Sequence, residues 1–250
     1  MSRAFRSAVW GLVLAAAIAG ATPRDAQAYA FGVSPIRLDF NRSTRTAALT
    51  VSNDDEIALS FQVRLVRWTQ DSAGEDRYED SKDLIYFPRL MKVEPREKRV
   101  IRLGTQRPPD PIEGTYRLIV EEMLPPAQPK GQATTVAVRM RFAVPVFVAP
   151  PEPVVRVEFQ DVAVDKGEVR FQLKNSGNTH AKVDSIALRR GGATVGEAAG
   201  WYVLAGATRK FGVALTAQAC GGAGPFELVV KGEGLDLKRE VVMDAGRCRP

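Results

Sequence analysis

The sequence predicts an all-β protein made of two tandem immunoglobulin-like β-sandwich domains, joined at a stiff corner in an angled, boomerang-like arrangement. Three observations predict this fold: strand-like alternation recurs along the chain, turn signals separate the strands at short intervals, and no segment has a convincing helical period. Three prolines within residues 150–153 form a stiff, extended linker. We therefore expect a first domain over residues 29–150 and a second over residues 151–250.

The N-terminus is typical of an export signal. Arg3 and Arg6 give it a positive start, an alanine-rich apolar stretch covers residues 8–21, and Ala26-Gln27-Ala28 supplies a small-x-small cleavage pattern. The apolar stretch is too short to span a bilayer comfortably. We expect residues 1–28 to be removed, and the mature protein to lie outside the cytoplasm without inserting into a membrane.

The first domain shows a series of short alternating segments. The segment Leu59–Trp68 is an example, with apolar side chains on one face and polar ones on the other. The cluster Asn53-Asp54-Asp55 marks a turn, and the polar residues 71–83 read as a loop. In order, the expected strands cover residues 32–40, 46–52, 59–68, 84–87, 98–103, 114–124 and 134–150.

The last of these strands, residues 134–150, is unusually long. Its apolar residues alternate with Thr135, Ala137, Arg139 and Arg141, so the strand has two unlike faces, and its end is apolar on both sides. Pro145 has no backbone N–H to donate, so the strand is either an edge or bulged there. The apolar face consists of Val136, Val138, Met140 and Phe142.

The second domain continues the same pattern after the linker. Turns such as Lys166-Gly167 and residues 175–178 separate its segments, and a β-sandwich of ordinary domain size fits them. The expected strands cover residues 154–159, 169–174, 181–189, 209–214, 226–230 and 237–242.

Composition and motifs argue against an enzyme. The only histidine, His180, follows an Asn/Gly-rich turn, where we expect a turn-stabilising role, and no serine lies in a GxSxG motif. No group of residues has metal-ligand spacing, so we expect no metal and no cofactor. The formal charge of +6, of which the signal segment holds +2, is too weak and too dispersed to favour nucleic acid. In an exported chain, Cys220 and Cys248 predict one structural disulfide.

Binding remains, and arginines are its best candidates. A guanidinium can hold a carboxylate through two parallel hydrogen bonds. Anchoring a chain terminus between two domains would need such a group. Arg37 lies in the first expected strand, Arg139 and Arg141 in the long one, and Arg89 just after Pro88.

Several segments together resemble one known family. They are VSPIRLDF (33–40), LTVSND (49–54), FPRLMKVEPREKRVIRL (87–103), YRLIVEEMLPP (116–126), VAVRMRFAVPVFVAP (136–150) and LKNSGNTHAKV (173–183). In order and spacing they are similar to the periplasmic chaperones of the chaperone–usher pathway for pilus assembly. Proteins of this family have the β-sandwich architecture and bind pilins by donor-strand complementation.

The resemblance implies a function. A pilus or fimbrial subunit would be bound, folded and capped in the periplasm by donor-strand complementation and delivered to an outer-membrane usher. Val136, Val138, Met140 and Phe142 would fill the subunit's groove. The exposed strand also makes self-association of the free protein an expectation. The alternative is a chaperone-like accessory protein of surface-fibre assembly that donates no strand.

The family also implies two basic residues for the subunit's C-terminal carboxylate. Arg37 matches the first, but the second falls at Pro145, which carries no charge. Arg139, Arg141 and Arg89 are the candidates to replace it. This departure indicates a divergent branch of the family.

Overall fold

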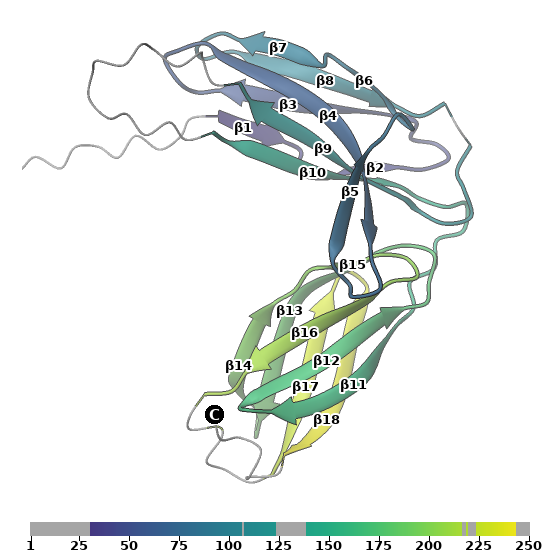
Figure 1. Cartoon of the computed structure of the whole chain (residues 1–250), viewed down its shortest axis with the longest axis vertical. Coiled ribbons are helices and arrows are strands. Elements are labelled where there is room, and N and C mark those ends of the chain that lie inside the picture. The colour runs from purple at the N-terminus through teal and green to yellow at the C-terminus, as the bar shows by residue number, and fades with distance from the viewer. Residues whose placement is uncertain (1–30, 107, 124–138, 217–218, 220–223, 244–250) are drawn as a thin grey trace, which may run out of the picture.

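The computed structural model describes residues 31–106, 108–123, 139–216, 219 and 224–243, which form two immunoglobulin-like β-sandwiches meeting at an angle (Figure 1). The all-β, two-sandwich fold predicted from the sequence is confirmed. In chain order the strands are β1 (Phe31–Ser34), β2 (Leu38–Phe40), β3 (Thr46–Asn53), β4 (Leu59–Gln70), β5 (Asp76–Asp80), β6 (Ile85–Phe87), β7 (Leu90–Val93), β8 (Lys98–Gly104), β9 (Gly114–Glu122), β10 (Arg141–Val148), β11 (Val157–Asp165), β12 (Glu168–Asn175), β13 (Ala181–Arg190), β14 (Ala193–Ala199), β15 (Tyr202–Val203), β16 (Thr208–Ala214), β17 (Gly224–Gly232) and β18 (Leu235–Met243).

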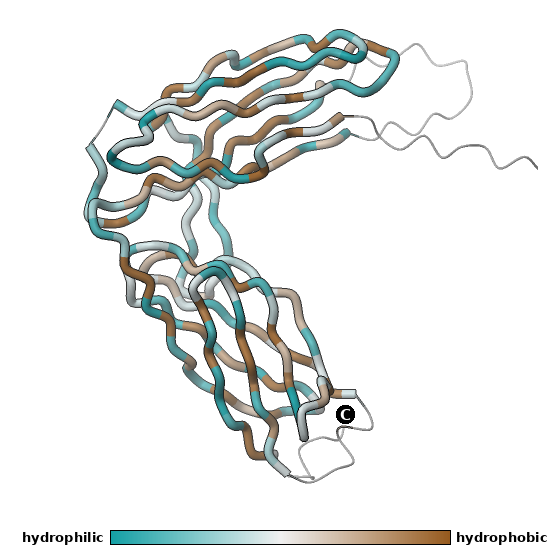
Figure 2. The backbone as a smooth tube through the Cα atoms, turned by 180° about the vertical axis from the view of Figure 1, so that it is seen from behind, coloured by the Kyte–Doolittle hydropathy of each residue, from teal (hydrophilic) through white to brown (hydrophobic). Residues whose placement is uncertain are grey.

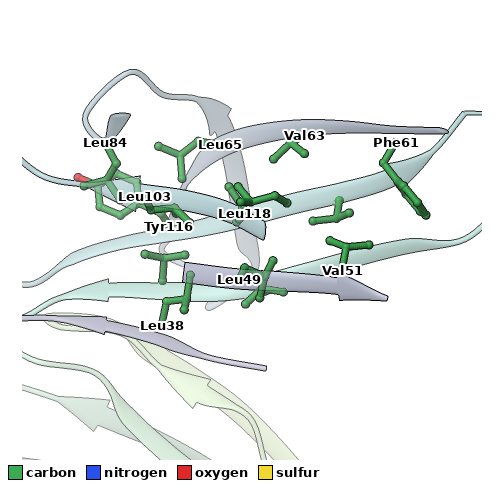
Figure 3. Packing of buried hydrophobic residues seen from close by; sticks show 14 of the residues in the cluster. Leu38, Leu49, Val51, Phe61, Val63, Leu65, Leu84, Leu103, Tyr116 and Leu118 are labelled. Carbon is green, nitrogen blue, oxygen red and sulfur yellow. The ribbon is translucent and has the colours of Figure 1, made fainter. Parts of the chain in front are cut away.

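The first sandwich packs two sheets face to face. One sheet has the strand order β1-β3-β8-β6, and the other has the order β2-β10-β9-β4-β5, with β7 pairing with one end of β4. Most neighbours are antiparallel, but β10 runs parallel to β2. The alternating residues of each strand supply the core, where Leu49, Phe61 and Leu118 are fully buried (Figure 3).

The expected strand over residues 32–40 is wrong in one respect, because the chain breaks it and changes sheets. β1 pairs with β3 in one sheet, whereas β2 pairs with β10 in the other. Pro35 lies in the break, and a residue without an N–H cannot continue a ladder of hydrogen bonds. Arg37 lies where the chain crosses from one sheet to the other, directly before β2 begins.

The second sandwich repeats this layered design. Its sheets have the orders β11-β12-β16 and β14-β13-β17-β18, with β15 pairing with the start of β13. In both sandwiches the hydrophobic residues alternate with polar ones along the strands (Figure 2). A fully buried asparagine closes a turn in each: the Asn53 amide donates to the carbonyls of Ile57 and Val93, and that of Asn175 to the carbonyls of Thr179 and Val203.

Four strands are absent from the sequence prediction. Residues 71–83 were expected to be a loop, but β5 lies within them and pairs with the second half of β4. β5 reads DRYED and is mostly exposed, so it shows no apolar alternation. β7, β14 and β15 are short or rich in small residues and are equally hard to recognise.

Candidate functional site

One edge of β10 is uncovered among the described strands. β10 lies between β9 and β2, but β2 pairs only with Val146–Val148. Over residues 141–145, the described strands pair with β10 on its β9 side alone. Such an edge presents backbone N–H and C=O groups to which another extended chain can pair. β1, the first strand of the opposite sheet, lies close to this edge (Figure 1).

Two of the four predicted groove-filling residues lie in the described part of the chain. Met140 and Phe142 are partly buried against the core of the first sandwich, and the Phe142 ring meets that of Phe31 edge-on at 5.0 Å between centroids. Val136 and Val138 lie outside the described residues. The described part of the apolar face is therefore continuous with the domain core.

Pro145 occupies the uncovered edge without a bulge. The register between β10 and β9 runs unbroken from Arg141 to Val148, and Pro145 lies opposite Arg117. The pairing with β2 begins one residue later, at Val146. The missing N–H of proline therefore interrupts no ladder with β2. Of the two alternatives left by the sequence, the structure shows the edge.

Arg37 bridges the two sandwiches. Its Nε donates to Asp39 Oδ2 at 2.8 Å, and its Nη1 donates to Glu233 Oε2 at 2.7 Å, in the turn between β17 and β18. The hydrogen bond with Glu233, more than the charge of Asp39, raises the pKa of Arg37, and the same bond lowers the pKa of Glu233. The Arg37 side chain is 33% exposed, so it is a fixed cation that solvent and a ligand can still reach.

The three arginines predicted as a second anchor lie away from Arg37. Extending the parallel register by one residue places position 145 beside Arg37, whereas Arg141, at the start of β10, and Arg139 before it lie four and six residues back along the chain, about 13 and 20 Å at the usual rise of a strand. Arg139 pairs with Glu121 at 3.5 Å. Arg89 follows β6, which is the edge strand farthest from β1 in the sheet that they share, and its guanidinium lies over the Tyr86 ring. The structure thus brings none of them to Arg37.

The β4–β5 hairpin reaches across to the second sandwich (Figure 1). Gln70 at the end of β4 donates to the Tyr202 carbonyl at 2.9 Å and accepts from the Leu204 backbone N–H at 3.0 Å. Asp76 at the start of β5 accepts from the Trp201 indole N–H at 2.8 Å. These bonds tie one strand pair of the first sandwich to β15 and its flanks.

Aromatic residues fill the joint beneath this hairpin. Trp68 and Phe147 of the first sandwich are buried with Leu204 of the second. The His180 ring stacks on Phe147, with centroids 3.7 Å apart, and its Nδ1 lies 2.8 Å from the buried Glu113 carboxylate. His180 was predicted to stabilise a turn. Its backbone N–H also bonds Glu113, and its ring belongs to the interface between domains.

Arg117 is a buried cation that no sequence motif singles out. Its guanidinium lies 3.8 Å from the centroid of the Trp68 ring and donates to the Ala143 carbonyl at 3.2 Å. Only 5% of the residue is exposed, and this burial lowers its pKa. The alternation along β9 places an arginine between Tyr116 and Leu118 on the face away from the core, where it is expected to be solvated. Only the joint explains its burial.

An exposed apolar patch lies at the far side of the first sandwich. It surrounds β6, which is the opposite edge of its sheet from β1. Its apolar members Phe87, Met91 and Val100 line one hollow together with Pro88 and the basic residues Lys92, Arg99 and Arg102. Contiguous apolar groups of this kind on a surface mark sites of interaction.

The described residues hold no group of three or more histidine, cysteine or acidic side chains suited to a metal ion. Within that same part of the chain, no helix has the length and apolar character needed to cross a bilayer. Cys220 and Cys248 fall outside the described residues. The architecture and the surface around β10 define the class of the protein as a two-domain, immunoglobulin-like binding protein.

Comparison with known proteins identifies the family. The family model described as pili and flagellar-assembly chaperone, PapD N-terminal domain, matches residues 30–153. Residues 30–153 therefore form a domain of the pili and flagellar-assembly chaperone family. No curated protein matches the sequence.

Solved structures share the two-domain fold. A chain of the CsuC–CsuE chaperone–tip adhesion subunit pre-assembly complex, from the archaic chaperone-usher Csu pili of Acinetobacter baumannii, is 24% identical with a TM-score of 0.58, over 84% of this chain and 97% of that chain. The CupB2 chaperone of Pseudomonas aeruginosa is 18% identical with a TM-score of 0.54, over 85% and 100%. A chain of the Salmonella enterica SafA pilin–SafB chaperone complex is 13% identical with a TM-score of 0.56, over 87% of this chain and 98% of that chain.

Proposed function

We propose that this chain is a periplasmic chaperone that holds pilus subunits by lending them the strand that ends in β10, and that it delivers them to an outer-membrane usher. One observation carries the proposal: the described strands leave the edge of β10 uncovered over residues 141–145, beside an apolar face that continues the domain core. The Csu and Saf structures are complexes of a chaperone with a tip adhesion subunit and with a pilin.

The physical argument rests on what a subunit lacking a strand exposes. Its groove would leave backbone groups unpaired and apolar side chains in water, and both promote aggregation. A strand with an open edge supplies the backbone partners, and alternate apolar side chains fill the groove. We propose that Val136, Val138 and Met140 fill it, with Phe142 at the boundary, because Phe142 already packs against Phe31.

Arg37 is the proposed anchor for the subunit's terminal carboxylate. It is a charged group at the domain boundary, level with position 145 of β10 when the parallel register is extended by one residue. A carboxylate bound there would fix the end of the subunit's strand against β10. Because the side-chain period of a strand is two residues, fixing one end also decides which face of the strand meets the groove.

Delivery to an usher requires a surface that the bound subunit leaves free. The apolar patch around β6 meets this need, because it lies at the opposite edge of the sheet from β1 and away from β10. Its basic neighbours favour a partner that presents acidic and apolar groups together. We propose this patch for the second contact.

The remaining parts of the proposal follow from the sequence. Residues 1–28 would direct export and be removed, leaving a domain over residues 29–150 and a second over 151–250. Cys220 and Cys248 would form a disulfide in the oxidising periplasm. The mechanism is steric and apolar, and we propose no catalytic step and no cofactor.

The test is co-purification from the periplasm of a strain that makes the fibre. We expect a subunit to co-purify with the parent chaperone and to be lost from a Val138→Arg variant, because an unpaired charge is costly in an apolar groove. Ala137→Arg is the matched control, since alternation places residue 137 on the other face of the strand. Circular dichroism verifies that each variant is folded.

If the Val138→Arg variant loses the subunit and the Ala137→Arg variant keeps it, strand donation is supported. If both variants keep the subunit, or if both lose it equally, the apolar face does not hold it. If no subunit co-purifies with the parent, the accessory-protein alternative replaces the proposal.

A further inference from the structure

A carboxylate held at Arg37, as the proposed function has it, would be held better by a second cation, and the strands next to Arg37 do not provide one. Arg117 lies directly opposite Pro145 on β9. Its guanidinium, however, is enclosed by the Trp68 ring and the Ala143 carbonyl, and it is almost fully buried. A cation committed to the joint in this way is not presented to a ligand. The second cation must therefore come from elsewhere around Arg37.

The second sandwich brings a lysine to this place. Lys182 lies at the start of β13, next to the end of β17, and a Cβ on Gly232 would collide with the Lys182 carbonyl oxygen. Glu233 follows Gly232 directly and carries its carboxylate to Arg37 Nη1. The lysine therefore lies close enough in the second domain for its charge to act on Glu233 and on Arg37.

The electrostatics agree with this arrangement. The pKa of Glu233 is lowered first by its bond to Arg37, and the charge of Lys182 acts in the same direction. Asp39 and Asp184 hold Arg37 and Lys182 in place through contacts of 2.8 and 2.7 Å. The position of the Glu233 carboxylate is thus a built site for one negative group.

Glu233 is also the most easily displaced member of this cluster. Its side chain is 64% exposed, it touches Arg37 through one guanidinium nitrogen, and glycines flank it in the turn. Gly234 has a φ of +67°, a conformation that lets the turn bend tightly. Swinging the carboxylate into water would therefore cost little, and it would open the Arg37 guanidinium to another carboxylate, with the charge of Lys182 near it.

We propose that Glu233 occupies, in the free chaperone, the place of a ligand's terminal carboxylate, and that Lys182 of the second domain is the second cation of this site. The inference rests on the proposed function, in which that ligand is the C-terminus of a bound subunit. It replaces the three arginines expected from the sequence. The subunit's carboxylate would displace that of Glu233 and be held between the two domains.

The experiment uses a small probe in place of the subunit. The ¹⁵N-labelled mature protein is titrated with N-acetyl-glycyl-tyrosine, as the free acid and as its C-terminal amide, while the Arg37 Nε–Hε resonance is followed. Removing a competing exposed carboxylate should strengthen binding of the acid to a Glu233→Gln variant by about fivefold, the size of one exposed ion pair. Lys182→Met should weaken it by a similar factor. Lys231→Met is the matched control, an exposed lysine near the end of β17, two residues before Glu233.

Unchanged or weaker binding of the acid to the Glu233→Gln variant would overturn the proposal, because Glu233 would then be a strut between domains and not a competitor. Equal effects of the Lys182→Met and Lys231→Met changes would remove Lys182 from the site. The amide should bind all variants alike. If the acid shifts Arg37 in no variant while the subunit still co-purifies through Val138, the carboxylate site fails and strand donation stands.

Discussion

Truncation of Phe147 to alanine should uncouple the two domains. Phe147 is 1% exposed, and its ring contacts one ring of its own domain, that of Trp68, and two of the second, those of His180 and Tyr202. Removing a buried phenylalanine side chain typically costs about 3–5 kcal/mol. Since two of the three ring neighbours belong to the other sandwich, we assign about 2 kcal/mol of this cost to the joint, a change of about 30-fold in the ratio of closed to open arrangements.

Small-angle X-ray scattering measures this change, and Val146→Ala is the control. Val146 is fully buried in the core of the first sandwich, and its truncation removes about two methylene equivalents, or about 2 kcal/mol. Both variants should unfold at lower urea concentration. Only Phe147→Ala should broaden the distribution of interatomic distances. If both variants keep the parent's scattering profile, Phe147 is an ordinary core residue and the joint is held by the hairpin alone.

Three further predictions concern the turns and the joint. Gly74→Val should loosen the β4–β5 hairpin, because Gly74 has a φ of +82° and a Cβ there would lie 2.6 Å from the Thr208 carbonyl oxygen. The measurement is hydrogen exchange of the amides of residues 71–76, which should become faster. Unchanged exchange would contradict the prediction. Asn175→Ala should cost about 2–4 kcal/mol in urea unfolding, since two buried carbonyls lose their donor, and a loss below about 1 kcal/mol would show that the turn repacks. The Arg37–Glu233 contact lowers the pKa of Glu233 from 4.5. The contribution of this contact to the free energy of unfolding is therefore complete above pH 4.5 and is lost as the pH falls through the lowered pKa. A Glu233→Gln variant should lack this acid-dependent step in unfolding experiments.

The strands with one buried face were predictable from the sequence. β4 shows why: from Leu59 to Leu65 its apolar residues alternate with more polar ones, because that face packs in the core of the first sandwich. β5 shows the limit, since its charged side chains lie outside both cores and its position depends on contacts with the second sandwich. A pattern within one segment does not contain such contacts.

The same limit applies to the candidate site. Arg37 was recognisable from its segment, but Glu233 lies 196 residues away, and only the angle between the domains brings the two together. His180 likewise reads as part of a turn until Phe147 and Glu113 are placed beside it. Lys182 is one of many lysines in the sequence and has no motif around it. The residues that join the domains therefore required the structure.

β10 is at once the strand with the uncovered edge and the strand that carries Phe147 into the joint, and its ladder with β9 is unbroken between them. Thermodynamic linkage follows from this continuity. If a subunit binds the edge more tightly at one angle between the domains, occupancy must shift the population toward that angle by the same free energy. The angle would then report to any second partner whether the chaperone is loaded.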